Sequence, residues 1–179
     1  VIAITDHVDM TNVEFVVKSV VKAVDLCEDY IKVIPGVEIT HVPPRKIAEV
    51  AKQARRFGAK WVVVHGETVT EPVMPGTNKA SVENPDIDIL AHPGFITLEE
   101  AQTAKDNDVI LEITGRMGHN ITNGHVYKMA HEVGAKMVID SDTHAPENLM
   151  DEAAALTVAL GAGLTKEEAD KALHVTPYE

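Results

Sequence analysis

The stretch Trp61–Glu67, "WVVVHGE", decides the fold of this chain. Its apolar residues form a run that is too short for a helix and rich in β-branched side chains, which predicts a buried strand. The run ends on a histidine, and a glycine and a glutamate follow where a loop begins. The same arrangement recurs along the chain. The stretch therefore indicates both the architecture and the place where polar groups gather.

Short apolar runs alternate with helix-like segments along the chain. Strands are expected at 2–5, 33–40, 61–65, 87–92, 109–114 and 137–140. Helices are expected at 13–30, 43–57, 97–107, 122–133, 146–160 and 165–173. Strands that are apolar throughout and alternate with helices are typical of a parallel sheet. The pattern predicts an α/β fold and one domain over residues 1–179.

Composition narrows the classes of function. The formal net charge of −12 argues against a nucleic-acid partner held by a general basic surface. The sequence has no run of about 18 apolar residues, so no membrane span is expected. Cys27 is the only cysteine, which is in keeping with a reducing compartment, and we expect a cytoplasmic protein.

Each expected strand has a histidine, aspartate or glutamate at or near its carboxyl end. These residues are Asp6, His7, Glu38, His65, Glu67, His92, Glu112, Asp140, Asp142 and His144. The carboxyl ends of parallel strands meet at one face, so these side chains should converge there. Glu38 and Glu112 lie inside apolar strands, where a carboxylate needs a partner. Imidazole and carboxylate groups without a thiolate indicate a divalent metal site for Zn, Mn or Fe.

Other polar residues are expected at the same face. Glu67 is either a ligand or a carboxylate that orients a histidine. Arg116 and His119 lie in the loop after the fifth strand, and His125 begins the next helix. An arginine beside a helix N-terminus suits a phosphate group, although these residues could equally serve only to order the loop. The histidines left over are His131, expected on the surface, and His41 and His174, which have no assigned role.

Six motifs in order resemble the polymerase and histidinol phosphatase (PHP) domain family. They are "ITDH", "PGVEIT", "VVVHGE", "DILAHPG", "LEIT" and "DSDTHAP". The resemblance implies a distorted (β/α)7-type barrel of parallel strands that holds up to three divalent metal ions. It also implies a metal-dependent phosphoesterase that hydrolyses a small phosphorylated substrate, a phosphomonoester or nucleotide, with a metal-bound hydroxide.

The resemblance also implies roles for individual residues. Glu38 would bridge two metals, and His65 and His92 would complete the ligands of one. Asp142 would bind the other metal, and His7 and His144 would help to hold a third. Arg116 or His119 would stabilise charge in the transition state. The carboxylates that would support the ligands are Asp6, Glu67 and Glu112.

The chain departs from the PHP pattern in one respect. The D-x-H-x-H motif of the family's first strand is absent from these 179 residues, and only about six strands are expected. We therefore expect a further β-α unit upstream of Val1 in the natural gene product.

Two alternatives to the phosphoesterase stay open. One is an amidohydrolase-like enzyme that cleaves C–N bonds, and the other is a metal-binding but inactive PHP module. A nuclease would need a local basic patch, and the sequence reading identifies none.

Overall fold

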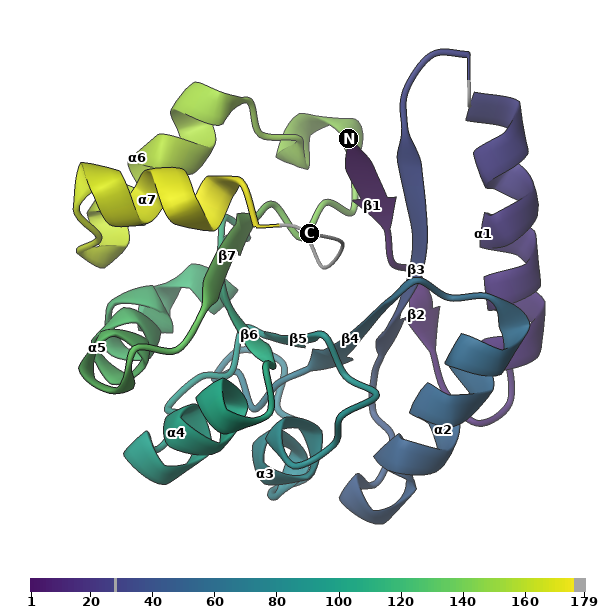
Figure 1. Cartoon of the computed structure of the whole chain (residues 1–179), viewed down its shortest axis with the longest axis horizontal. Helices are drawn as coiled ribbons and strands as arrows, with labels where there is room; N and C mark the ends of the chain where they lie inside the picture. Colours follow the sequence, from purple (N-terminus) through teal and green to yellow (C-terminus); the bar gives the residue numbers. More distant parts are fainter. Residues whose placement is uncertain (28, 176–179) are drawn as a thin grey trace.

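Parallel strands curl around an open centre, and helices cover the outside of the sheet (Figure 1). The computed structural model describes residues 1–27 and 29–175. In this part of the chain the strand order is β1-β3-β4-β5-β6-β7, and β2 pairs with β3 beyond the end of β1. The strands form half a barrel in an α/β arrangement, which confirms the predicted fold class with about six strands present.

The strands agree closely with the apolar runs of the sequence. They are β1 (Ile2–Ile4), β2 (His7–Val8), β3 (Val33–Ile39), β4 (Trp61–His65), β5 (Ile89–Ala91), β6 (Ile110–Thr114) and β7 (Met137–Asp140). The first expected strand is broken, because β1 and β2 both pair with β3 and are separated by Thr5 and Asp6. Each neighbouring pair is parallel, as the alternation with helices predicted.

The helices follow the strands in turn. They are α1 (Val13–Cys27), α2 (Pro44–Phe57), α3 (Thr77–Val82), α4 (Leu98–Asp106), α5 (Asn123–Val133), α6 (Glu152–Ala162) and α7 (Lys166–Leu173), with the 3-10 turns η1 (His119–Thr122) and η2 (Pro146–Asn148). The capping box expected at Thr97 and Glu100 is present. No helix in the described ranges is both long enough and apolar enough to cross a membrane.

In three segments the structure differs from the helices and loops that the sequence predicts. The helix expected over 13–30 ends at Cys27; residue 28 lies outside the described residues, and residues 29–30 form a turn. Helix α3 lies in a segment expected to be a loop. The helix expected over 146–160 is divided, because Leu149 is extended and Asp151 starts a new helix by accepting a hydrogen bond from Ala154 N–H.

Successive side chains of a strand point to opposite faces of the sheet, so the strands contribute to two apolar layers. Val62 and Val64 of β4 pack in the larger cluster between the sheet and the helices. Val63 faces the inside of the half-barrel, in a smaller cluster with Ile89 and Val138. The apolar side chains of both layers are removed from water, and this burial stabilises the curled sheet.

The inner face changes from apolar to polar along each strand. Glu38 is in register with Val63 on the neighbouring strand, and Ile89 is in register with Ile110. Two residues further along β4 and β6 the same inner face carries His65 and Glu112. The polar groups therefore lie above an apolar floor, at the carboxyl ends of the strands, as the sequence predicted.

The sheet is open on one side. Its order begins at β1 and ends at β7, and within residues 1–27 and 29–175 no ladder joins these two strands. A cavity of about 1420 Å³ extends along the opening, and its lining includes Ile4, Trp61, His92 and Met150. Among residues 1–27 and 29–175, the centre of the half-barrel is therefore open at the side as well as at the mouth.

Replacing Gly36 by alanine is expected to destabilise the protein. A Cβ at this position would lie 2.8 Å from the Trp61 carbonyl oxygen and 2.8 Å from Thr5 Cγ2, so β3 and β4 would have to separate. We expect Gly36→Ala to lower the free energy of unfolding by about 1–3 kcal/mol in urea titrations.

Gly161→Ala provides the matched control. Gly161 lies within α6, and a Cβ there meets nothing within 4 Å. This variant should raise the free energy of unfolding by about 0.5–1 kcal/mol, because alanine favours the helix. Equal urea midpoints for Gly36→Ala and the unchanged protein would contradict the proposed close approach of the two strands.

Candidate functional site

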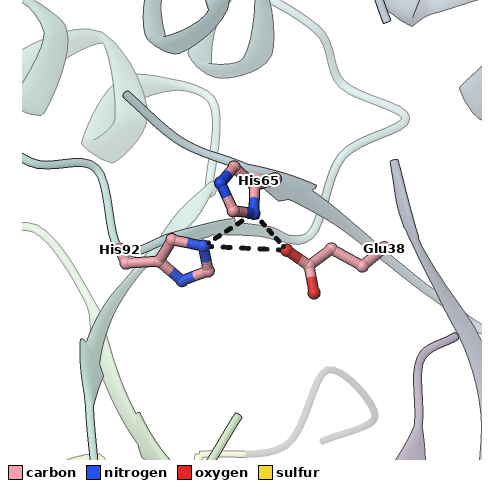
Figure 2. Close-up of side chains that lie close together, drawn as sticks. All are labelled: Glu38, His65 and His92. Atoms are coloured by element: carbon pink, nitrogen blue, oxygen red, sulfur yellow. Dashed lines mark hydrogen bonds and ion pairs between the residues drawn. The ribbon is translucent and has the colours of Figure 1, made fainter. Parts of the chain in front are cut away.

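Three buried side chains meet where β3, β4 and β5 end (Figure 2). Glu38 comes from β3, His65 ends β4, and His92 directly follows β5. His65 Nδ1 lies 3.1 Å from Glu38 Oε1 and 3.0 Å from His92 Nε2, which is itself 3.7 Å from Glu38 Oε1. One potential ligand atom of each residue lies within 4.8 Å of the others. We call these three residues the inner cluster.

A second set of potential ligands shares His92 with the inner cluster. His119 from η1 and Asp142 after β7 offer atoms within 4.8 Å of one another and of His92. The rings of His92 and His119 have centroids 4.4 Å apart. His119 Nδ1 is buried and has no hydrogen-bond partner among the described residues. The sequence reading gave His119 a role in charge stabilisation, whereas the structure places it among the potential ligands.

Two residues of these sets have unusual backbone conformations. His92 has φ 29° and Asp142 has φ 44°, in the left-handed region that non-glycine residues rarely adopt. His41, beside the inner cluster, has φ 56°, and its ring is stacked with that of His65 at a centroid distance of 5.9 Å. Such conformations cluster at functional sites, and three of the four non-glycine residues with positive φ in the described chain lie at the mouth; the fourth, Asp108, is in an exposed turn.

The pKa shifts of Glu38, His92 and His119 favour the forms that bind a cation, whereas the shift of His65 opposes it. Burial opposes the charged form of Glu38, but contacts with His65 and His7 outweigh it and lower the pKa of Glu38. Burial lowers the pKa of His92, and it lowers the pKa of His119 to about 4. For His65, burial is outweighed by the Glu38 carboxylate, which raises its pKa. Carboxylate and neutral imidazole are the forms that bind metals.

Glu112 orients His92 from below. His92 Nδ1 donates to Glu112 Oε2 at 2.8 Å, and the backbone N–H of His92 donates to the same oxygen. This leaves Nε2 of His92 directed toward the inner cluster, 3.0 Å from His65 Nδ1. Burial raises the pKa of Glu112 to about 7, and burial with the neighbouring Glu112 carboxyl raises the pKa of Asp140.

His7 and His144 lie at the exposed edge of the mouth. Their ring centroids are 5.4 Å apart, and their side chains are 45% and 43% exposed. His7 Nε2 lies 3.4 Å from Glu38 Oε2, and His144 Nδ1 lies 3.2 Å from Asp142 Oδ1. The structure therefore brings the two histidines together, but on the outer side of the buried sets.

The remaining predicted site residues make other contacts. Asp6 is exposed, and its carbonyl accepts a hydrogen bond from Glu38 N–H. Glu67 Oε1 accepts from the backbone N–H groups of Gly76 and Asn78, so this carboxylate holds the start of α3 instead of orienting a histidine. Arg116 lies 3.4 Å from Asp142 and donates to His144 Nδ1 at 2.6 Å.

His125, which was expected at the mouth, and the leftover histidines His131 and His174 have partners away from the buried sets. His125 Nε2 bonds with Ile96 O at 2.8 Å, and His174 Nδ1 bonds with Asp170 O at 2.8 Å. His131 is on the surface as expected and lies 2.7 Å from Glu168. None of the three therefore takes part in the clusters at the mouth.

Helix α2 carries a basic charge that the sequence reading missed. Its sequence, "PRKIAEVAKQARRF", holds five of the chain's 16 lysines and arginines and a single acidic residue. The signal was present in the sequence but was hidden by the net charge of −12 for the whole chain. Charge must be assessed for each element, because a local patch can bind where the total charge would repel.

Comparisons with known proteins identify relatives in archaea. A Methanocaldococcus jannaschii protein described as "Uncharacterized protein MJ1295" is 50% identical over 181 residues, covering 99% of this chain and 83% of that protein. Ribonuclease P protein component 3 of Methanosarcina barkeri is 26% identical over 161 residues, covering 82% of this chain and 64% of that protein. No family model matches the chain.

A solved structure has a similar fold. A chain in the cryo-EM structure of archaeal ribonuclease P with mature tRNA aligns with a TM-score of 0.70 and 20% identity. The alignment covers 94% of this chain and 75% of that chain. At this level of identity the likeness concerns the fold.

These findings correct the predicted family and activity. Membership of the PHP family is wrong, because the relatives include a ribonuclease P component and no family model supports PHP. The metal-dependent phosphoesterase acting on a small phosphorylated substrate is wrong for the same reason. The prediction failed because polar residues at the strand ends are typical of any parallel β/α fold. Unrelated protein families share this fold, so the residues do not identify one family.

The prediction that nucleic acid is not a partner is also contradicted. The structural neighbour is part of a complex with tRNA, and helix α2 supplies the local basic charge that the sequence reading did not find. With 50% identity over 99% of its length, the chain belongs to the family of the protein MJ1295 of Methanocaldococcus jannaschii.

Proposed function

We propose that the protein is a non-catalytic subunit of an RNA-processing assembly in the cytoplasm. The observation that carries this proposal is the agreement of two independent comparisons. A sequence relative is ribonuclease P protein component 3, and a structural neighbour is a chain of archaeal ribonuclease P bound to tRNA. In such a role the half-barrel would support an assembly through its surfaces.

The polar mouth is compatible with a role outside catalysis. Its charged groups contact one another, with Glu38 between His7 and His65 and with Asp142 between Arg116 and His144. Groups that are already paired in this way stabilise a rigid arrangement of loops.

Cleavage of a precursor tRNA tests the proposed function. The purified protein alone, with Mg²⁺, Mn²⁺ or Zn²⁺, should leave the transcript intact. Added to a ribonuclease P RNA and its other protein components, it should increase the rate of cleavage. The matched control is an unrelated protein of similar size and net charge. Equal rates with both proteins would count against a subunit role, as would cleavage by the protein alone.

We also propose that the inner cluster holds one divalent cation, Zn²⁺, Mn²⁺ or Fe²⁺, and that His119 and Asp142 provide donors beside it. The buried nitrogen and oxygen donors suit these metals, and the unpartnered Nδ1 of His119 is a further indication. The cation would link β3, β4 and the loop after β5. The cation would take the place of the proton that the Glu38 carboxylate stabilises on His65.

Thermal unfolding tests the metal proposal. Zn²⁺ at about 100 times its dissociation constant should raise Tm by about 5–10 °C, since binding to the folded state alone adds about 2.7 kcal/mol. His92→Asn should abolish most of this shift, because His92 belongs to both sets of ligands.

The matched control is His131→Asn, since His131 is exposed and contacts Glu168 of α7. This variant should keep the full shift with Zn²⁺. The same Tm increase in His92→Asn and in the unchanged protein would rule out the inner cluster, and metal content measured by elemental analysis gives an independent check.

A further inference from the structure

Three basic side chains of α2 form a stripe on its outer face. Ile47, Val50 and Ala54 are buried against the sheet, whereas Arg45, Lys52 and Arg56 are exposed. The spacings of seven and four residues place the three cations on one side of the helix. They extend over about 16 Å of the helix, at 1.5 Å per residue. We call Arg45, Lys52 and Arg56 the α2 stripe.

The stripe is not used to hold the fold together. Arg55 on the same helix shows what a structural cation does, because it bonds with Asp88 at 2.7 Å and with the carbonyls of Lys60 and Asp86. Lys46 pairs with Glu49 at 2.6 Å; Glu49 is the single acidic residue of α2, and its exposed carboxylate lies on the same helix face, between Arg45 and Lys52. Within residues 1–27 and 29–175 the three residues of the stripe make no ion pair and no side-chain hydrogen bond.

Parts of the stripe are unfavourable for the helix itself. The N-terminus of a helix favours acidic side chains, but the first turn of α2 contains Arg45 and no acidic residue. The first turns of α1, α4, α6 and α7 contain glutamate, whereas those of α3 and α5, like that of α2, contain no acidic residue. Lys52 and Arg56 are like charges one turn apart, which repel each other, although Arg56 suits the helix C-terminus. Departures from local rules are expected at functional sites, and the basic first turn of α2 is one such departure.

We propose that the α2 stripe binds the phosphate backbone of RNA, an inference that rests on the proposed function. A row of exposed cations on one helix face complements a row of phosphates, and no base-specific group is required. The residues outside α2 carry a formal net charge of −16, because the whole chain carries −12 and α2 contributes +4. This net acidity elsewhere favours an RNA contact at the outer face of the half-barrel that α2 forms (Figure 1).

Binding of a fluorescent precursor tRNA transcript, measured by anisotropy at several salt concentrations, tests this proposal. The variant is Arg45→Gln/Lys52→Gln/Arg56→Gln in the full chain. We expect its affinity to fall at least about tenfold and its log–log salt slope to decrease by about 2, since each lost phosphate contact removes about 0.7–0.9 from the slope. Its urea midpoint should not fall, because the replaced charges are unpaired.

The control removes the same charge from elsewhere. Lys32→Gln/Lys128→Gln/Lys166→Gln changes three exposed lysines outside α2. It should bind the transcript within about twofold of the unchanged protein if the stripe, not total charge, determines binding. Equal loss in both triple variants, or no loss in the stripe variant, overturns the proposal. Normal RNA binding with failed assembly onto the other protein components also overturns it, and identifies an acidic protein as the occupant.

The cleavage assay separates this proposal from the proposed function. A stripe variant that increases precursor cleavage as well as the unchanged protein does, and binds the transcript equally well, removes the stripe proposal and leaves the subunit role intact. If the unchanged protein neither binds the transcript nor increases cleavage, both proposals fail together.

Discussion

The parallel pairing of β3 with its two neighbours is the constraint on which the mouth depends. Glu38 is in register with His7 on β2 and with Val63 on β4, and this register fixes how far each strand extends. Because side chains alternate along a strand, a slip of one residue would turn Glu38 away from His65. The apolar floor of Val63 and Ile89 opposes such a slip, since it would expose these residues or bury polar ones. The positions of the polar groups are therefore fixed by apolar side chains that pack two residues earlier along the same strands.

The parts of the fold that local chemistry determines could be predicted from the sequence. β4 begins and ends as expected, and Thr97 caps α4 as expected, because β-branched runs and capping boxes act within a few residues. The convergence of Glu38, His65 and His92 was also predictable, since parallel strands end at one face. The position of His119 was not, because η1 lies in a loop whose path depends on tertiary contacts.

The function was not predictable in the same way. The strand-end motifs are properties of a parallel mouth, and they do not determine which protein family uses it. The basic charge of α2 was visible in the sequence, but averaging over 179 residues removed it. Buried donors at the mouth and exposed cations on α2 are separate features with separate chemistry. The mouth concentrates acidic and imidazole groups inside the sheet, whereas α2 presents its charge to solvent on the outside.

The order of the open sheet has a consequence for how the chain folds. From β3 to β7 each strand pairs with the next strand of the sequence, so each pairing closes a loop of similar, moderate length. In the described part of the chain no pairing between β1 and β7 has to bring the two ends together, and such a long closure would be the slowest to form. The sheet can therefore grow one β-α unit at a time in the direction of synthesis. From β3 onward, the partner of each strand has already been synthesised when that strand leaves the ribosome.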